Sequence, residues 1–100
     1  MITINSLNLD GIIFMGIHLE LPYTNLFIIM NEMGFIMSTT LHLEFFPDFS
    51  NERKLIAAVM PEVNQIDELL QAPIEKLTEE AKKIGWFVGM KGKDALLTIV

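Results

Sequence analysis

Two histidine–glutamate pairs are the groups in this sequence that most suggest chemistry. His18 precedes Glu20 by two positions, and His42 precedes Glu44 by two positions. On a β-strand, residues i and i+2 lie on the same face, so each imidazole would sit beside its carboxylate. Two such pairs on adjacent strands could bind a metal ion. The alternative, a solvated polar edge of the sheet, is the ordinary place for His and Glu. We favour it and expect neither a metal nor a cofactor.

Three consecutive hydroxyl residues, at positions 38–40, precede His42. Nucleophilic catalysis needs a base beside the hydroxyl and a third group that orients the base. Thr40 and His42 share a strand face, and no orienting group is evident. Because β-branched threonine is favoured in sheets, a structural role is the preferred interpretation. Thr40 and His42 remain candidates for a ligand site.

A glycine- and lysine-rich segment, GMKGKD at positions 89–94, superficially resembles a phosphate-binding loop. The true signature is Gly-x-x-x-x-Gly-Lys-Ser/Thr. Here Phe87 stands where the first glycine belongs, and Asp94 replaces the magnesium-binding hydroxyl, so we reject that function. Backbone N–H groups together with Lys91 and Lys93 could still hold a small anion. A plain turn with solvated lysines is the favoured alternative.

The composition indicates one apolar domain, residues 1–100, because domains usually span about 100–150 residues. Hydrophobic residues make up 51% of the 100 residues. A short chain has a large surface for its volume, so this content predicts more apolar surface than a monomer can hide. With zero cysteines, disulfides, thiolate metal sites and cysteine nucleophiles are excluded.

The distribution of charge argues against nucleic acid and membrane partners. Residues 1–52 contain no Lys or Arg and six acids, whereas residues 53–100 carry seven bases and seven acids. Binding to nucleic acid or anionic lipid depends on Lys and Arg. No apolar run reaches the 18 residues of a membrane span, and the N-terminus lacks the basic start of a signal peptide. We expect a cytoplasmic protein.

The hydrophobic pattern predicts an α+β fold, with an N-terminal antiparallel β-sheet and C-terminal helices packed on one face. Alternating residues over 2–43 predict the sheet, with a hairpin turn at Asp10–Gly11 and a bulge at Asn5–Ser6. Residues 55–60 are a fifth strand candidate. Helical spacing predicts helices near 64–70 and 74–84, the second ending at Gly85. Residues 93–100 are compatible with either helix or strand.

The sheet of residues 1–43 is also predicted to build a homo-oligomer. Residues 26–30 are apolar on both faces, and positions 12 and 14 add apolar bulk to the even face of their strand. Helices from residues 53–100 can cover only one face, so the other would expose an unusually large apolar patch. Burial against a copy of the chain is the simplest remedy. The residues expected at this interface are Ile12, Phe14, Phe27, Ile29 and Ile36.

Four short motifs resemble the YunC-like family of bacteria and archaea, domain-of-unknown-function family 1805. They are Thr24-Asn25-Leu26, Gly34-Phe35-Ile36-Met37, Ile66-Asp67-Glu68-Leu69-Leu70 with Ala72-Pro73, and Gly89-Met90-Lys91-Gly92-Lys93-Asp94-Ala95-Leu96. They follow the family's order and spacing from about residue 11 to residue 97. The resemblance implies an N-terminal β-sheet that assembles a homotetramer, and no established activity.

Two stretches depart from the family's pattern. Ser38-Thr39-Thr40-Leu41-His42 stands where members usually carry Cys-Gly-Ala-Leu-Asp, and Glu62-Val63-Asn64-Gln65 replaces Gly-Val-Arg-Thr. The chain therefore lacks the family's Cys, Asp and Arg, which favours a structural or interaction role over catalysis. The alternative is a small-molecule or anion binding protein, or an enzyme, with a site between subunits that uses Thr40, His42, Lys91 and Lys93.

Overall fold

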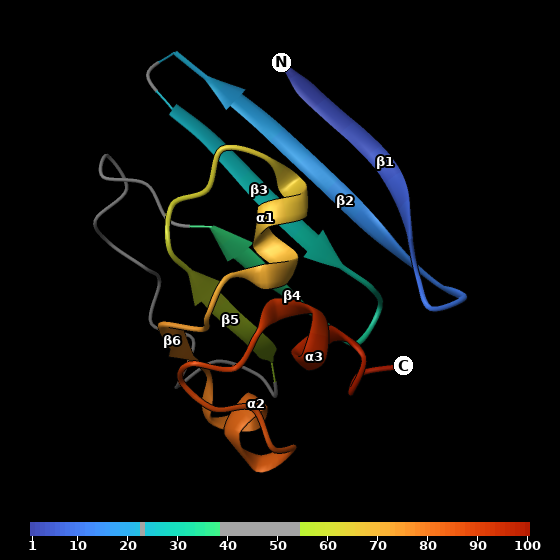
Figure 1. Ribbon diagram of the computed structural model, residues 1–100, viewed down its shortest axis with the longest axis vertical. Helices are drawn as coiled ribbons and strands as arrows, with labels where there is room; N and C mark the ends of the chain where they lie inside the picture. The colour runs from blue at the N-terminus through green and yellow to red at the C-terminus, as the bar shows by residue number, and fades with distance from the viewer. Residues whose placement is uncertain (23, 39–54) are drawn as a thin grey trace.

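The structure, a computed structural model, describes residues 1–22, 24–38 and 55–100 (Figure 1). Within these residues six strands form one sheet, in the order in which they occur along the chain. They are β1 (Ile2–Leu9), β2 (Ile12–Leu21), β3 (Thr24–Met30), β4 (Gly34–Ser38), β5 (Ile56–Met60) and β6 (Lys76–Leu77). Strands β1 to β4 form an antiparallel meander, β5 is parallel to β4, and β6 is antiparallel to β5.

The β1–β2 hairpin turns at the predicted Asp10–Gly11 pair. Both residues have positive φ angles, 54° and 89°, as the two central positions of the commonest tight hairpin turn require. The Gly11 N–H donates to Asn8 Oδ1 at 2.8 Å. The predicted bulge at Asn5–Ser6 is wrong, because pairing runs without interruption from Ile2↔Leu19 to Leu9↔Ile12. This regular register decides which face every side chain of the hairpin occupies.

The helices are short and follow the sheet in sequence. They are α1 (Ile66–Gln71), α2 (Glu79–Lys83) and α3 (Gly92–Leu96). Helix α1 lies at the predicted position, and α3 shows that residues 93–96 are helical. The fold is α+β, as predicted.

The prediction of one helix over residues 74–84 is wrong in its first half. Ile74 N–H donates to the Met90 carbonyl at 2.9 Å, and Lys76–Leu77 pair with β5. These tertiary hydrogen bonds hold the chain extended despite the helical spacing of its apolar residues. The helix starts only after Thr78, whose side chain accepts the Ala81 N–H and caps α2. Past α2, Gly85 adopts the expected left-handed φ of 105°.

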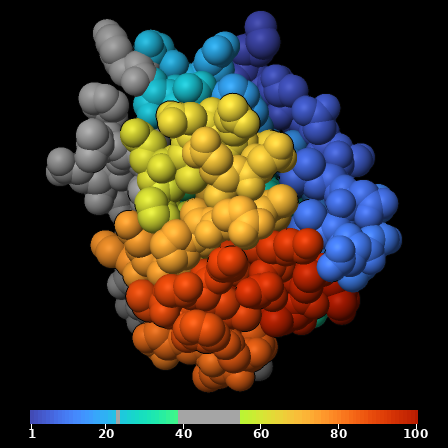
Figure 2. Space-filling model, in the orientation of Figure 1, coloured from blue at the N-terminus to red at the C-terminus, as the bar shows by residue number. Residues whose placement is uncertain are grey.

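The hydrophobic core lies between the sheet and helices α1 and α3. Helices α1 and α3 and the segments around them cover this face of the sheet, while the β1–β2 hairpin stays at its side (Figure 2). Close approach of α1 depends on Gly16 in β2, where a Cβ atom would lie 2.8 Å from Ile66 Cδ1. At Gly92 in α3 a Cβ would lie 2.8 Å from Ile36 Cδ1. Two positions without side chains therefore set how closely the helices pack onto the sheet.

Candidate self-association surface

The face of the sheet that points away from α1 and α3 is an apolar surface, here called the open face. The register aligns one row across four strands, Ile4–Ile17–Ile28–Met37, and a second row, Ser6–Met15–Met30–Phe35. Because side chains alternate along a strand, both rows lie opposite the core residues Phe14 and Ile29. Over β1 to β4 the described residues of the open face carry no charge.

Large side chains on the open face are exposed to solvent. Ile2 is 62% exposed, Ile4 58%, Ile13 59% and Met15 46%. Their apolar neighbours are half-buried: Ile17, Leu19, Leu21, Ile28, Met30, Phe35 and Met37. Together these side chains form a continuous apolar patch over four strands, whereas monomers usually scatter their exposed apolar side chains singly. The open face therefore has the character of an interface.

The structure places in the core most of the residues that the sequence assigns to an interface. Phe14, Phe27, Ile29 and Ile36 are between 0 and 4% exposed, and they belong to the core beneath the helices. Ile12 is half-buried and packs against that core. The even-numbered face of β2 thus faces the helices, and its odd-numbered face, the more uniformly apolar of the two, faces outward.

The sequence of β2 explains why the helices cover its even-numbered face rather than its odd-numbered face. The even-numbered face offers the gap at Gly16 into which α1 docks, whereas the odd-numbered face presents bulky side chains at every position. The even-numbered face of β2 ends in polar residues, His18 and Glu20, and these are not buried in the apolar core. His18 Nε2 lies 2.8 Å from Asn25 Oδ1, and its ring stacks on Phe27 with a centroid distance of 4.5 Å.

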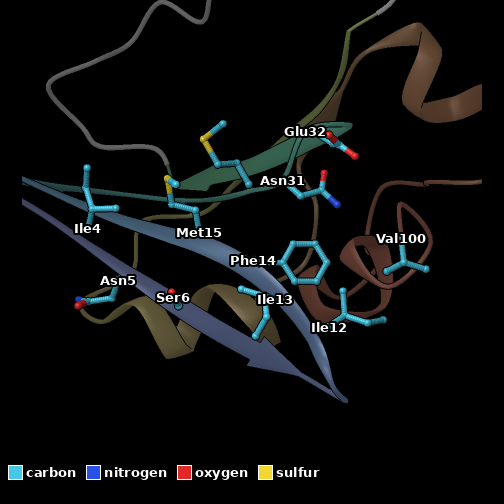
Figure 3. A pocket seen from close by; sticks show the side chains of 11 residues that line it. Ile4, Asn5, Ser6, Ile12, Ile13, Phe14, Met15, Asn31, Glu32 and Val100 are labelled. Atoms are coloured by element: carbon cyan, nitrogen blue, oxygen red, sulfur yellow. The ribbon is translucent and has the colours of Figure 1, made fainter.

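A groove of about 780 Å³ hollows the molecule at the end of the open face (Figure 3). The groove opens because β3 ends at Met30, opposite Met15 of β2. The first three residues of β2, 12–14, therefore pair with β1 alone. Asn31 shapes one wall: its side chain donates to the Ile99 carbonyl at 2.7 Å and accepts the Met33 and Gly34 N–H groups. The groove is lined mainly by apolar side chains and is continuous with the open face through Met15 and Met30.

The other candidate residues do not come together within the described part of the chain. Thr40 and His42 lie outside the described residues, as does Glu44. Lys93 Nζ lies 3.7 Å from Asp10 Oδ1, so this lysine closes the hairpin turn against α3. Lys91 is exposed. Among the described residues no three His, Cys, Asp or Glu side chains are grouped as metal ligands would be.

The described residues form an α+β protein in which helices α1 and α3 pack on one face of a six-stranded sheet. Residues 47–99 match the sequence model of DUF1805, a domain of unknown function. The uncharacterized protein YunC of Bacillus subtilis (strain 168) is 33% identical over 100 residues, which span 100% of this chain and 99% of YunC. The chain belongs to the DUF1805 family.

A solved structure shows the same fold. The crystal structure of TA1206, a protein of unknown function from Thermoplasma acidophilum, superposes with a TM-score of 0.86 at 22% identity. The match covers 100% of this chain and 94% of the archaeal chain. In the described part of the present structure, no helix combines the length and apolar character needed to cross a membrane.

Proposed function

We propose that this protein is a structural or interaction protein that assembles with copies of itself through the open face. One observation carries the proposal: the open face is uncharged over four strands, yet Ile4, Ile13 and Met15 are each about half exposed. The apolar side chains of this face extend over all four strands of the meander, so the patch is contiguous. A surface of this size is an interface when it is covered and a liability for aggregation when it is not.

A second copy of the chain is the occupant that the face fits best. In a two-fold contact the same patch occurs on both subunits, so the patch must be complementary to itself. A face without charges meets this condition, because no like charges oppose one another. The whole chain carries a net charge of −6, so two copies repel at long range. Added salt screens that repulsion, and we expect self-association to strengthen as ionic strength rises.

The proposed assembly is a homotetramer, a number that the family resemblance supports. The proposed location is the cytoplasm, the compartment expected from the sequence. Binding at Thr40, His42, Lys91 and Lys93 is not proposed, because the first two lie outside the described residues and no described contact joins the two lysines.

The test is the change Met15→Lys, which places like charges on an apolar interface. Met15 is 46% exposed, so the lysine is tolerated in a monomer, but its burial between two subunits is unfavourable. The control is Gln71→Lys, the same charge on an exposed residue at the end of α1, on the helical side. Sedimentation should give the wild type and the control a mass that is a multiple of 11.4 kDa, halved by Met15→Lys. A wild-type mass of 11.4 kDa at micromolar concentration would refute the proposal.

A further inference from the structure

The groove at the end of the open face has the dimensions of a small-molecule site. Its volume of about 780 Å³ falls within the range of about 300–1,000 Å³ that is typical of such sites. Most of its lining is aliphatic or thioether, and the flexible side chains of Met15 and Met30 can adapt to the shape of a ligand. In Figure 3 the lining side chains extend from Ile4 at one end towards Glu32 at the other. The groove therefore suits an elongated apolar molecule.

The wall formed by the turn between β3 and β4 is fixed by the protein itself. The Asn31 side chain makes three hydrogen bonds, all to backbone groups, at 2.7, 2.8 and 3.1 Å. One of these bonds, to the Ile99 carbonyl, ties the turn to the segment that follows α3. Because the wall is already held in place, a ligand does not have to order it on binding, which favours affinity. Asn31 is thus a structural residue of the wall, and its polar atoms are already engaged.

Glu32 is the one charged side chain among the described residues that line the groove. It is exposed, and its carboxylate makes no hydrogen bond or ion pair with another described residue. The polar lining residues of β1, Asn5 and Ser6, are uncharged. Lys93 of α3 does not line the groove and pairs with Asp10 instead. A positive charge opposite Glu32 would therefore come from a ligand.

We propose that the groove binds an amphiphilic amine, a molecule with an aliphatic chain and a positively charged ammonium head. The chain lies along Ile4, Met15 and Met30, and the head pairs with the Glu32 carboxylate. A fatty acid of the same length would place its carboxylate beside Glu32, on a protein whose net charge is already −6. A neutral alcohol would leave Glu32 without a counter-charge. The site lies within one chain, so the inference does not rest on the proposed self-association.

Calorimetric titration of the full chain with octylamine, octanol and octanoate tests the choice of head group. Octylamine should bind about two- to fivefold more tightly than octanol, the range that an exposed ion pair provides, and octanoate should bind most weakly. Added salt should reduce the preference for the amine, because it screens the ion pair. A series from hexylamine to decylamine tests the chain, and each added methylene should strengthen binding by up to about fourfold.

Two variants separate the head from the chain, each with a matched control. Glu32→Gln should remove the preference for octylamine over octanol and leave the affinity for octanol unchanged. Glu75→Gln, which removes the same charge from an exposed residue beside β6 at the far edge of the sheet, should keep the preference. Ile13→Ala should weaken amine and alcohol by the same factor. Ile84→Ala, at a residue that is 41% exposed and outside the groove, should weaken neither.

The methyl signals of methionine locate the bound amine by nuclear magnetic resonance. Octylamine should shift the signals of Met15 and Met30, whereas that of Met60, a core residue with 0% exposure, should stay in place. Unshifted signals of Met15 and Met30 would overturn the inference. Equal affinities for octylamine and octanoate would overturn it as well.

The dependence of binding on protein concentration separates a ligand from a second copy of the chain as the occupant of the groove. We expect the same dissociation constant for octylamine at every protein concentration. Binding that weakens as the protein concentration rises would identify the second copy as the occupant, which refutes the amine site and supports self-association. Octylamine binding with the expected selectivity to a protein that sediments at 11.4 kDa would support the amine site and refute the proposed assembly.

Discussion

Identical Ile→Ala changes on opposite faces of the sheet should have very different effects on the free energy of unfolding. Ile29 in β3 is 0% exposed and belongs to the core beneath the helices. Ile13 in β2 is 59% exposed on the open face. The two substitutions remove the same atoms, so the difference between them measures only which face the helices cover.

The expected magnitudes follow from burial. Ile29→Ala leaves a cavity and should lower the free energy of unfolding by about 2–5 kcal/mol. The stability of a small domain is about 5–15 kcal/mol, so the loss is a large fraction of the total. Its midpoint temperature should fall by roughly 10 °C or more. Ile13→Ala removes a side chain that is already mostly hydrated, and its cost in the monomer should stay below about 1 kcal/mol.

Urea unfolding in the Met15→Lys background is the appropriate assay, because association otherwise adds to the apparent stability. Both variants are measured at one protein concentration, with fluorescence and circular dichroism as probes. Equal losses for Ile13→Ala and Ile29→Ala, or a larger loss at Ile13, would show that the helices cover the odd-numbered face of β2. That result would remove the basis for the open face.

Two further changes test how the helices are held against the sheet. Thr78 is buried, and its Oγ1 donates to the Leu55 carbonyl at 2.6 Å while accepting two backbone N–H groups. Thr78→Val should therefore lower the free energy of unfolding, measured in urea, by about 1–3 kcal/mol. Thr78→Ser keeps the hydroxyl and should restore most of that stability, and an equal loss in both variants would argue against the hydrogen bonds. Gly92→Ala places a Cβ against the Leu69 carbonyl and should cost about 1–3 kcal/mol by overpacking. The control for Gly92→Ala is Asp94→Ala, a change on the exposed side of α3. If the Gly92→Ala protein were as stable as the Asp94→Ala protein, the close packing of α3 would be contradicted.

Local sequence signals were sufficient where the structure is decided by neighbouring residues. The positive φ angles at Asp10 and Gly11 follow from turn chemistry alone, and the hairpin turns where the sequence places it. The same holds for Gly85, which is left-handed after α2. Each of these features depends on the steric preferences of a few consecutive residues, so the sequence is enough to predict it.

The helix predicted over residues 74–84 failed for a different reason. Ile74, Leu77 and Ala81 have helical spacing, but the backbone of the first two is held by β5 and by the segment around Met90. Hydrogen bonds to partners distant in sequence outweighed the weak local preference. No periodicity within the segment reports on such partners.

By itself the sequence determined the fold class, the antiparallel N-terminal sheet and the expectation that apolar surface would be left over. It did not determine which face of the sheet is left over, because both faces of β2 and β3 are apolar enough to form a core. That choice depends on Gly16, which admits Ile66 of α1, and on Gly92, which admits Ile36. Packing between residues tens of positions apart decides it, since a helix docks where side-chain volume is missing rather than where hydrophobicity is greatest.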